Sequence, residues 1–418
     1  MRSGKILLIN LTGRNVPGLM TMLTTTLAQY QVHVLDIGQS VIHNELNLGI
    51  LAQFQNPENV PQMQLTLSDL LGEFEASVRY TNVDDSDYSE WVAKQGRPRH
   101  IITMLARSLG AEHLAAIITT VESSGLVIDG VRRLSGRVSL DDDKNSSNRV
   151  SIELTVRGKL PDQLKVKDEL LRIAGAMDVD CSIQRDSVYR RNRRLVAFDM
   201  DSTLIREEVI DELAKLAGVG DAVSAITQRA MSGQLDFKES FCARVALLKG
   251  LPETALKEVA NNVVLTDGAK KLLTSLKTLG YKTAILSGGF EYVAQHLKGE
   301  LGVDYVYANT VEIVDGVLSG RVTNDIVDAQ RKADLLQEIC VSEGIDLQQV
   351  VAIGDGANDL PMLSVAGLGV AFHAKPVVRD RADHAISNLG LDCVLYLMGF
   401  SDTDVEALTN LVSAPSGG

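Results

Sequence analysis

Short apolar runs alternate with amphipathic stretches along the chain, and their order divides it into three segments. In the first segment the pattern predicts strand, helix, two strands, helix and strand. The second segment predicts the same order again, so we expect two βαββαβ units about one domain apart. The predicted strands lie at residues 5–11, 32–42, 46–54 and 76–83 in the first unit and at 100–106, 126–140, 150–156 and 178–187 in the second.

The third segment has a different pattern, in which apolar strands alternate with helical stretches. The runs LVAF at 195–198, TAIL at 283–286 and VVAI at 350–353 are typical of parallel strands covered by helices on both faces. Each run leads directly into a polar turn. Because ligands bind beyond the carboxyl ends of the strands in such sheets, we expect the three turns to meet at one site. The predicted fold class is α/β, a Rossmann-like parallel sheet preceded by two α+β units.

These patterns predict three domains, at residues 1–95, 96–189 and 190–412. A length of 418 residues agrees with two to three cores of ordinary size. The basic tract RRNRR at 190–194 lies at the last boundary. We interpret it as a solvated linker rather than a nucleic-acid patch, because isolated basic runs usually face solvent.

Composition narrows the function classes. Hydrophobic residues make up 45% of the chain and charged residues 23%, which is the balance of a soluble globular protein. A formal net charge of −13 disfavours nucleic acid and anionic membranes as partners. No apolar run is long enough to span a membrane. The four cysteines are widely spaced and form no metal or redox motif, so we expect free thiols and a cytoplasmic location.

The three turns carry the residues on which chemistry can rest. DMDST at 199–203 places Asp199 and Asp201 on one side of the extended chain, where their repulsion requires a cation, a shared proton or water. SGGF at 287–290 can hold a phosphate with a hydroxyl and backbone N–H groups. GDGAND at 354–359 combines glycines with carboxylates that suit a hard cation. Each pattern alone is also that of an ordinary cap or turn.

Together with Lys332 on a predicted helix, these turns resemble the four ordered motifs of the haloacid dehalogenase superfamily over about residues 195–391. The resemblance implies a set of roles: Asp199 as nucleophile, Asp201 as general acid/base, Ser287, Gly288 and Lys332 as phosphate ligands, Asp199, Asp201 and Asp355 as ligands of Mg²⁺, and Asp359 in support. An ionised carboxylate needs no base to act as a nucleophile. An acid at Asp201 suits an alkoxide leaving group, which disfavours a dehalogenase.

Residues 207–265 separate the first turn from the second and are rich in helical periodicity, which predicts a helical cap. The cap resembles that of the phosphoserine phosphatases. The resemblance implies that Glu208 lies near the substrate amine, Arg244 on its carboxylate and Met231 and Phe237 as apolar walls, while Asn358 reaches substrate and phosphate. Without the resemblance these positions would be ordinary helix surface or packing.

The two βαββαβ units resemble ACT domains, which pair and bind amino acids at their interfaces. The turn GRNVPG at 13–18 fits the ligand loop of that family and implies an effector site at Asn15 and Gly18, with serine as the natural effector. The corresponding loop RSLGA at 107–111 lacks the Pro-Gly pair. The resemblance thus implies amino-acid regulation, a homodimer, or both.

The expected function is hydrolysis of O-phospho-L-serine to L-serine and phosphate through an aspartyl-phosphate, the last step of serine biosynthesis. Two enzymatic alternatives would use the same residues: phosphotransfer from phosphoserine to another alcohol, and hydrolysis of another small phosphoester. A third alternative is a non-catalytic amino-acid sensor. The intact Asp199, Asp201, Lys332 and Asp355 argue against it.

Overall fold

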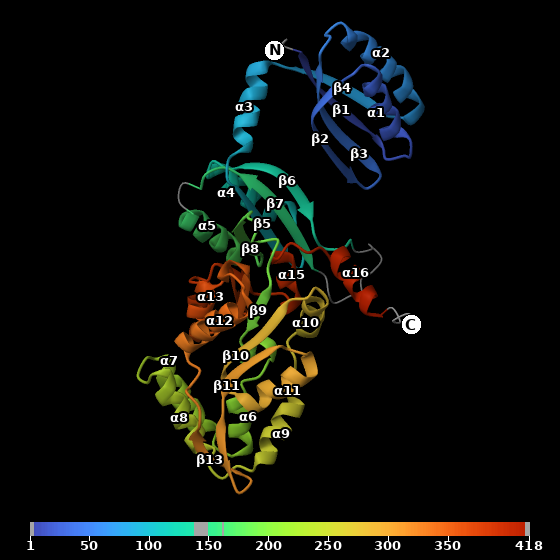
Figure 1. The fold of residues 1–418 in the computed structure, drawn as a ribbon. Coiled ribbons are helices and arrows are strands. Elements are labelled where there is room, and N and C mark those ends of the chain that lie inside the picture. Colours follow the sequence, from blue (N-terminus) through green and yellow to red (C-terminus); the bar gives the residue numbers. More distant parts are fainter. Residues whose placement is uncertain (1–3, 138–148, 161–162, 414–418) are drawn as a thin grey trace. The chain divides into compact units, whose positions relative to one another are not determined.

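A computed structural model describes residues 4–137, 149–160 and 163–413 of the chain, which separates into two compact units, Met1–Arg97 and Pro98–Gly418 (Figure 1). The second unit contains both the second βαββαβ segment and the parallel sheet. The predicted boundaries of the three domains stay predictions.

The first unit is a four-stranded antiparallel sheet in the order β2-β3-β1-β4 with two helices packed on it. Its elements are β1 (Lys5–Arg14), α1 (Leu19–Gln29), β2 (His33–Ile42), β3 (Glu45–Phe54), α2 (Asn59–Leu71) and β4 (Ser77–Val83). Alternate residues of β1 and β3 are buried against α1 and α2, where Leu23, Met63 and Leu67 are fully buried. The predicted βαββαβ order is confirmed here. Strand β2 lies at the edge and exposes Val34, Ile37 and Ile42.

A helix that the sequence analysis did not predict follows β4. α3 (Asp85–Gln95) buries none of its side chains and has an ion pair between Glu90 and Lys94, one turn apart, at 2.6 Å. Its sequence is mostly polar, and its apolar residues Tyr88, Trp91 and Val92 make up only one short stripe, which the sequence analysis did not recognise as a helix.

The second unit begins with a sheet of the same order, β6-β7-β5-β8. Its elements are β5 (Arg99–Ala106), α4 (Ala111–Ser123), β6 (Val127–Arg133), β7 (Val150–Arg157), α5 (Gln163–Ala176) and β8 (Asp180–Arg185). The strand predicted at 126–140 ends at Arg133, and its residues 138–140 lie outside the described part of the chain.

A six-stranded parallel sheet follows, in the order β11-β10-β9-β14-β15-β16. The strands are β9 (Leu195–Phe198), β10 (Lys282–Phe290), β11 (Tyr305–Asn309), β14 (Val350–Gly354), β15 (Leu368–Phe372) and β16 (His384–Ile386). Strand β9 lies between β10 and β14, so the three predicted strands are neighbours. The predicted parallel sheet is confirmed.

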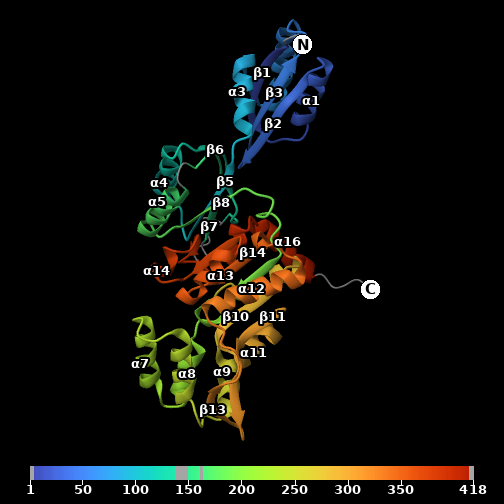
Figure 2. The same ribbon diagram turned by 60° about the vertical axis from the view of Figure 1, so that its left-hand side comes forward.

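Helices cover both faces of this sheet (Figure 2). Val196 and Phe198 of β9 point to one face, where α10 (Ala269–Thr278) and α11 (Glu291–Leu301) pack. Leu195 and Ala197 point to the other, where α12 (Ala329–Glu343) and α13 (Leu360–Val365) pack. Because both faces are buried, the strand reads as a continuous apolar run.

The predicted helical cap is confirmed as α6 (Val209–Leu216), α7 (Gly220–Met231), α8 (Phe237–Leu247) and α9 (Glu253–Asn262). A hairpin of β12 (Val311–Val314) and β13 (Val317–Val322) adds to it. Its turn residues Asp315 and Gly316 both have positive φ, as a tight two-residue hairpin requires. Leu318 exchanges backbone hydrogen bonds of 2.8 Å with Gly250 and Leu251, which joins the hairpin to the cap.

The basic tract at 190–194 is only partly the solvated linker that the sequence suggested. Arg191 is exposed, but Arg190 and Arg193 are buried. Arg190 forms an ion pair of 2.6 Å with the buried Glu153 of β7, and Arg193 donates to the carbonyls of Gln348 and Gly367. These partners are distant in the sequence, so the pattern of the tract alone could not reveal them.

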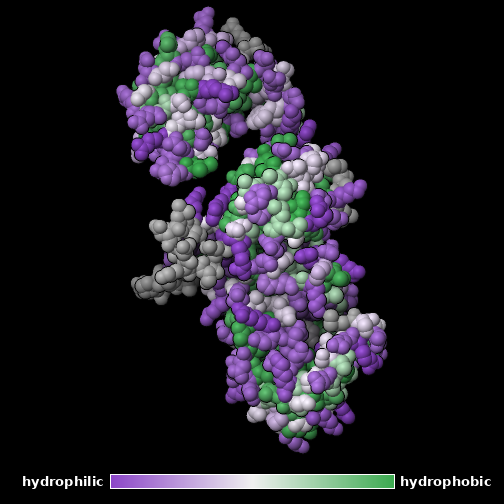
Figure 3. Space-filling view, turned by 180° about the vertical axis from the view of Figure 1, so that it is seen from behind, coloured by the Kyte–Doolittle hydropathy of each residue, from purple (hydrophilic) through white to green (hydrophobic). Residues whose placement is uncertain are grey.

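None of the described helices is long and apolar enough to cross a membrane. The face of the chain in Figure 3 mixes hydrophilic and hydrophobic residues.

Candidate active site

The carboxyl ends of β9, β10 and β14 bring the three predicted turns together. Asp199 directly follows β9, and its backbone N–H donates to the carbonyl of Ile353 in β14 at 2.9 Å. Ser287 and Gly288 lie in the last part of β10, which extends to Phe290. Asp355 directly follows β14. The chain continues from β9 to β10 and β11 on one side and then to β14 on the other, so the strand order reverses at β9, where such sheets bind ligands.

Lys332 is fully buried on α12 and forms two ion pairs. Its Nζ lies 2.8 Å from Oδ2 of Asp199 and 2.7 Å from Oδ1 of Asp359. Burial alone would lower the pKa of Lys332, but the two carboxylates outweigh burial and raise that pKa. The ammonium group therefore stays charged beside the predicted nucleophile.

Carboxyl oxygens of Asp199, Asp355 and Asp359 lie within 4.8 Å of one another. Thr203 donates to Asp355 at 3.2 Å, and Gly356 N donates to Asp359 at 2.9 Å. Burial, followed by the charge of Asp359, raises the pKa of Asp355 to about 7 and that of Asp199 well above its usual range. Three carboxylates beside one ammonium leave an excess of negative charge, and hard oxygen donors of this kind suit a divalent cation such as Mg²⁺.

The Asp201 carboxylate is not part of this cluster in the described chain, although the sequence predicted it as a metal ligand. Its Oδ1 accepts from the N–H of Val209 in the cap at 3.3 Å. Burial, followed by the charge of Glu208, raises the pKa of Asp201 well above its usual range. Asp199 and Asp201 thus face different surroundings, and the role of the Asp201 side chain as a metal ligand stays a prediction.

The cap contributes charged and apolar groups to the same place. The hydroxyl of Ser202 donates to Glu208 at 2.8 Å. Arg244 is half-buried, and its guanidinium contacts only the Ser240 carbonyl and the Thr227 hydroxyl, at 3.4 and 3.5 Å, with no carboxylate ion pair in the described residues. Burial lowers the pKa of Arg244. An arginine in this setting is poised to bind an anion.

A cavity of about 180 Å³ lies between the cap and the strand ends. Eight residues predicted from the sequence line it: Asp199, Asp201, Glu208, Phe237, Arg244, Gly288, Asp355 and Asn358. Ser287, Lys332 and Asp359 are fully buried and do not line it. Met231 is the last residue of α7, and its side chain lies outside the described part of the chain.

Four further residues line the cavity. The sequence analysis did not predict Ile210 and Phe241, and it included Gly289 and Phe290 only as members of the SGGF turn. Phe241 and Arg244 follow Phe237 by one and two turns of α8, so helical spacing could have revealed Phe241. Position 289 requires glycine because the Asp201 side chain approaches its backbone closely, and a Cβ there would lie 2.4 Å from Oδ2 of Asp201. Only the fold creates that approach.

Comparisons with known proteins agree with this geometry. Residues 196–364 match the haloacid dehalogenase-like hydrolases, and residues 5–81 match the ACT domain. The phosphoserine phosphatase of Streptomyces coelicolor is 41% identical over 411 residues, which span 97% of this chain and 95% of that protein. The chain belongs to the phosphoserine phosphatase family of the haloacid dehalogenase-like hydrolases.

Further similarities within this family extend over most of the chain. The phosphoserine phosphatase of Mycobacterium tuberculosis is 37% identical over 400 residues, covering 96% of this chain and 94% of that protein. The crystal structure of a haloacid dehalogenase family hydrolase from Salmonella enterica serovar Typhi is 34% identical, with a TM-score of 0.62, and covers 72% of this chain and 98% of its own. The predicted family, fold class and enzyme class are confirmed.

In the first unit, the predicted effector residues Asn15 and Gly18 lie in the exposed turn between β1 and α1. The N–H of Asn15 donates to the carbonyl of Asn44 at 2.8 Å. Gly18 has φ 96°, and a Cβ there would meet Phe74 at an ordinary 3.5 Å. Within the unit, the backbone conformation at position 18, not lack of space, favours glycine.

The raised pKa of Asp355 predicts that cation affinity depends on pH. Below about pH 7 the carboxyl group holds a proton that a cation must displace, so affinity for Mg²⁺ should fall by up to about tenfold per pH unit on acidification. Above that pH the group is ionised, and the affinity for Mg²⁺ should no longer change with the titration of Asp355. Calorimetric titration of metal-free protein between about pH 5.5 and 8 measures this. An affinity that does not change over that pH range would contradict the assignment of Asp355 as a cation ligand.

Proposed function

We propose that this chain hydrolyses O-phospho-L-serine to L-serine and phosphate, with Asp199 as the nucleophile. The observation that carries the proposal is one cavity whose two sides present different charged groups. The sheet side presents Asp199 beside Lys332, and the cap side presents Arg244 and Glu208. A phosphate, a carboxylate and an ammonium group on one small molecule match these charges.

Asp199 is held for attack on phosphorus. Its Oδ1 accepts from the N–H of Met200 at 2.7 Å, and its Oδ2 is bound by Lys332. Lys332 favours the ionised carboxylate and reduces its repulsion from an anionic phosphate. A cation held by Asp199, Asp355 and Asp359 would add positive charge beside the transferred phosphoryl oxygens, and we propose Mg²⁺ for this place. Attack forms an aspartyl-phosphate as the bond to the serine oxygen breaks.

Asp201 is suited to move the protons. Its raised pKa favours the protonated carboxyl group, which can donate to the leaving serine alkoxide. The resulting carboxylate can then take a proton from the water that hydrolyses the aspartyl-phosphate. The hydrogen bond from Val209 keeps the group at the junction of cap and sheet.

The other predicted roles fit this arrangement to different degrees. Arg244 would bind the substrate carboxylate, Glu208 its ammonium group, and Phe237 and Met231 its apolar edge. Gly288 and Asn358 line the cavity within reach of the phosphate. Ser287 accepts from the N–H of Gly289 at 2.9 Å, which leaves its own proton free to donate. Because Ser287 is fully buried, its contact with phosphate requires a local adjustment.

We also propose that L-serine, the product, regulates the enzyme at the turn of Asn15 and Gly18. The match of residues 5–81 to the ACT domain supports this. A homodimer and a cytoplasmic location stay predictions. The exposed apolar edge strand β2 supports the former.

Asp199→Asn should lower phosphate release from phosphoserine by at least roughly three orders of magnitude, because an amide is a poor nucleophile. Phosphate release with magnesium, together with covalent labelling by phosphate-labelled substrate, measures the effect. Asp334→Asn, at a half-buried position of α12 where the carboxylate accepts from Gln330, is the control and should leave turnover unchanged. Near-normal hydrolysis by Asp199→Asn would exclude the aspartyl-phosphate mechanism.

Arg244→Ala should lower kcat/KM for phosphoserine by about 10- to 100-fold, because a charge-assisted contact with the substrate carboxylate is lost. O-phosphoethanolamine lacks only that carboxylate, so its kcat/KM should change much less. Arg229→Ala, on an exposed position of the cap helix α7, controls for the loss of a positive charge. Equal losses with both substrates would remove Arg244 from carboxylate recognition.

L-Serine should inhibit without competing with phosphoserine, and inhibition should weaken by about 5- to 150-fold in Asn15→Ala. Asn15 is exposed, so its truncation should not disturb the unit. Gly18→Val is less suitable because φ 96° would strain valine. Asn47→Ala, on an exposed position of β3, is the control. Purely competitive inhibition, or inhibition unchanged in Asn15→Ala, would place serine elsewhere.

A further inference from the structure

Two short chain segments connect the cap to the sheet, and they are hydrogen-bonded to each other. Ile205 and Leu265 form an antiparallel bridge. The N–H of Arg206 donates to Val264 at 3.0 Å, and that of Thr266 donates to Leu204 at 2.9 Å. We call residues 204–206 and 264–266 the linker pair. Its geometry sets the distance between the cap groups, such as Arg244, and the nucleophile Asp199.

The linker pair is fixed to a turn near the end of the chain. The N–H of Leu391 donates to the carbonyl of Asp267 at 2.7 Å, one residue beyond the linker. Gly268 directly precedes α10 and has φ 83°. A Cβ on this residue would lie 2.4 Å from Oδ1 and 2.7 Å from N of Asp392. No side chain fits between these two backbones. A shift of Asp392 therefore moves the start of α10 and the adjoining linker.

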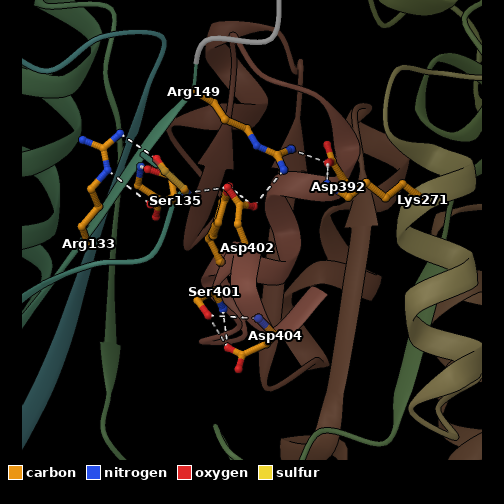
Figure 4. Close-up of polar contacts among 11 residues, drawn as sticks. Arg133, Ser135, Arg149, Lys271, Asp392, Ser401, Asp402 and Asp404 are labelled. Carbon is orange, nitrogen blue, oxygen red and sulfur yellow. Dashed lines mark hydrogen bonds and ion pairs between the residues drawn. The ribbon is translucent and has the colours of Figure 1, made fainter. Parts of the chain in front are cut away.

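Asp392 is held from the second βαββαβ sheet by Arg149, the residue before β7 (Figure 4). One Nη of Arg149 pairs with Asp392, and the other lies 2.9 Å from Oδ1 of Asp402. The guanidinium also lies 5.3 Å from the ring centre of Tyr396. Asp392 is 8% exposed, and its ion-pair partners are Arg149 and Lys271, the latter at 3.3 Å.

Attachment of this sheet to the rest of the unit does not depend on Arg149. Leu105 and Leu134 belong to the same core cluster as the cap and the parallel sheet. The N–H of Gly136 also donates to Asp402 at 2.7 Å, and the N–H of Asp402 donates to Leu134 at 2.9 Å. Besides its contacts with Asp402 and Tyr396, Arg149 adds the contact to Asp392, which leads to the linker pair.

We propose that Arg149 is a positioning residue for the phosphatase reaction, which holds the linker pair through Asp392 and thereby places the cap over Asp199. The proposal rests on the proposed function for its kinetic readout. It gives the second βαββαβ unit a part in catalysis, because a side chain of that unit sets the geometry of a cavity that none of the unit's described residues lines.

Arg149→Met in the full chain tests the proposal. Without Arg149, Asp392 keeps its ion pair with Lys271 but loses its ion pair with the second βαββαβ sheet. The hydrogen bonds of the linker pair should then break more often. Hydrogen exchange at the Arg206 and Thr266 amides should accelerate, and KM for phosphoserine should rise, each by about 2- to 30-fold. The turnover number should change less, because Asp199 and Lys332 lie outside the linkers. Arg149→Lys should show smaller changes in exchange and KM than Arg149→Met, since lysine keeps the positive charge but lacks the two separate nitrogens with which Arg149 pairs with Asp392 and Asp402.

Arg157→Met is the matched control, because Arg157 lies at the other end of β7 and pairs with Asp129 of the same sheet at 2.7 Å. It should leave linker exchange and KM unchanged. If Arg149→Met does not fold, Arg149→Lys provides the same comparison.

Linker exchange at the parental rate in a folded Arg149 variant would overturn the proposal, as would faster exchange with an unchanged KM. A parent protein that does not hydrolyse phosphoserine would instead refute the proposed function, while the exchange measurement would still test the link from Arg149 to the cap.

Discussion

Lys332 is fully buried, and the rest of the candidate site depends on the way its charge is compensated. A lysine without partners at this depth would lose its proton or destabilise the fold. Asp199 and Asp359 compensate it, but together with Asp355 they leave more negative than positive charge. The triad of Asp199, Lys332 and Asp359 fixes the end of β9, helix α12 and the turn after β14 relative to one another. The remaining negative charge makes the same place suitable for a divalent cation.

The chemistry and the recognition belong to different parts of the chain. In the proposed function, the strand ends supply the nucleophile and the phosphate side of the cavity, and the cap supplies Arg244, Glu208 and Phe237. Asp201 lies at their junction, where a cap amide contacts a carboxylate of the sheet. Such a division requires the cap and the sheet to be held in a fixed relative position. The linker pair and the polar contacts at Asp392 provide a physical basis for that position, and through Arg149 the second βαββαβ unit contributes to it.

Much of the site could be predicted because its residues follow buried strands directly. An apolar run that ends in DMDST or GDGAND gives both the strand and the position of its functional end, and parallel neighbours bring such ends together. The cap residues could be placed by resemblance, since their residue types alone are those of ordinary helix surfaces. Phe241 was missed although its spacing from Phe237 on α8 carried a signal. The resemblance placed Asp201 among the metal ligands, but only the folded chain shows that its carboxylate lies outside the cluster of Asp199, Asp355 and Asp359.

The sequence by itself determined the order of the elements, the parallel sheet and the identity of the residues at its carboxyl edge, because hydrophobic periodicity and turn chemistry are local. The tertiary structure decided which charges are buried and which partners compensate them. Lys332, Arg190 and Arg149 are all basic residues that local pattern would place in solvent. Each is instead held by carboxylates from distant segments: Lys332 by Asp199 and Asp359, Arg190 by Glu153, and Arg149 by Asp392 and Asp402. Burial and electrostatic pairing depend on contacts between remote parts of the chain, and these exist only once the chain has folded.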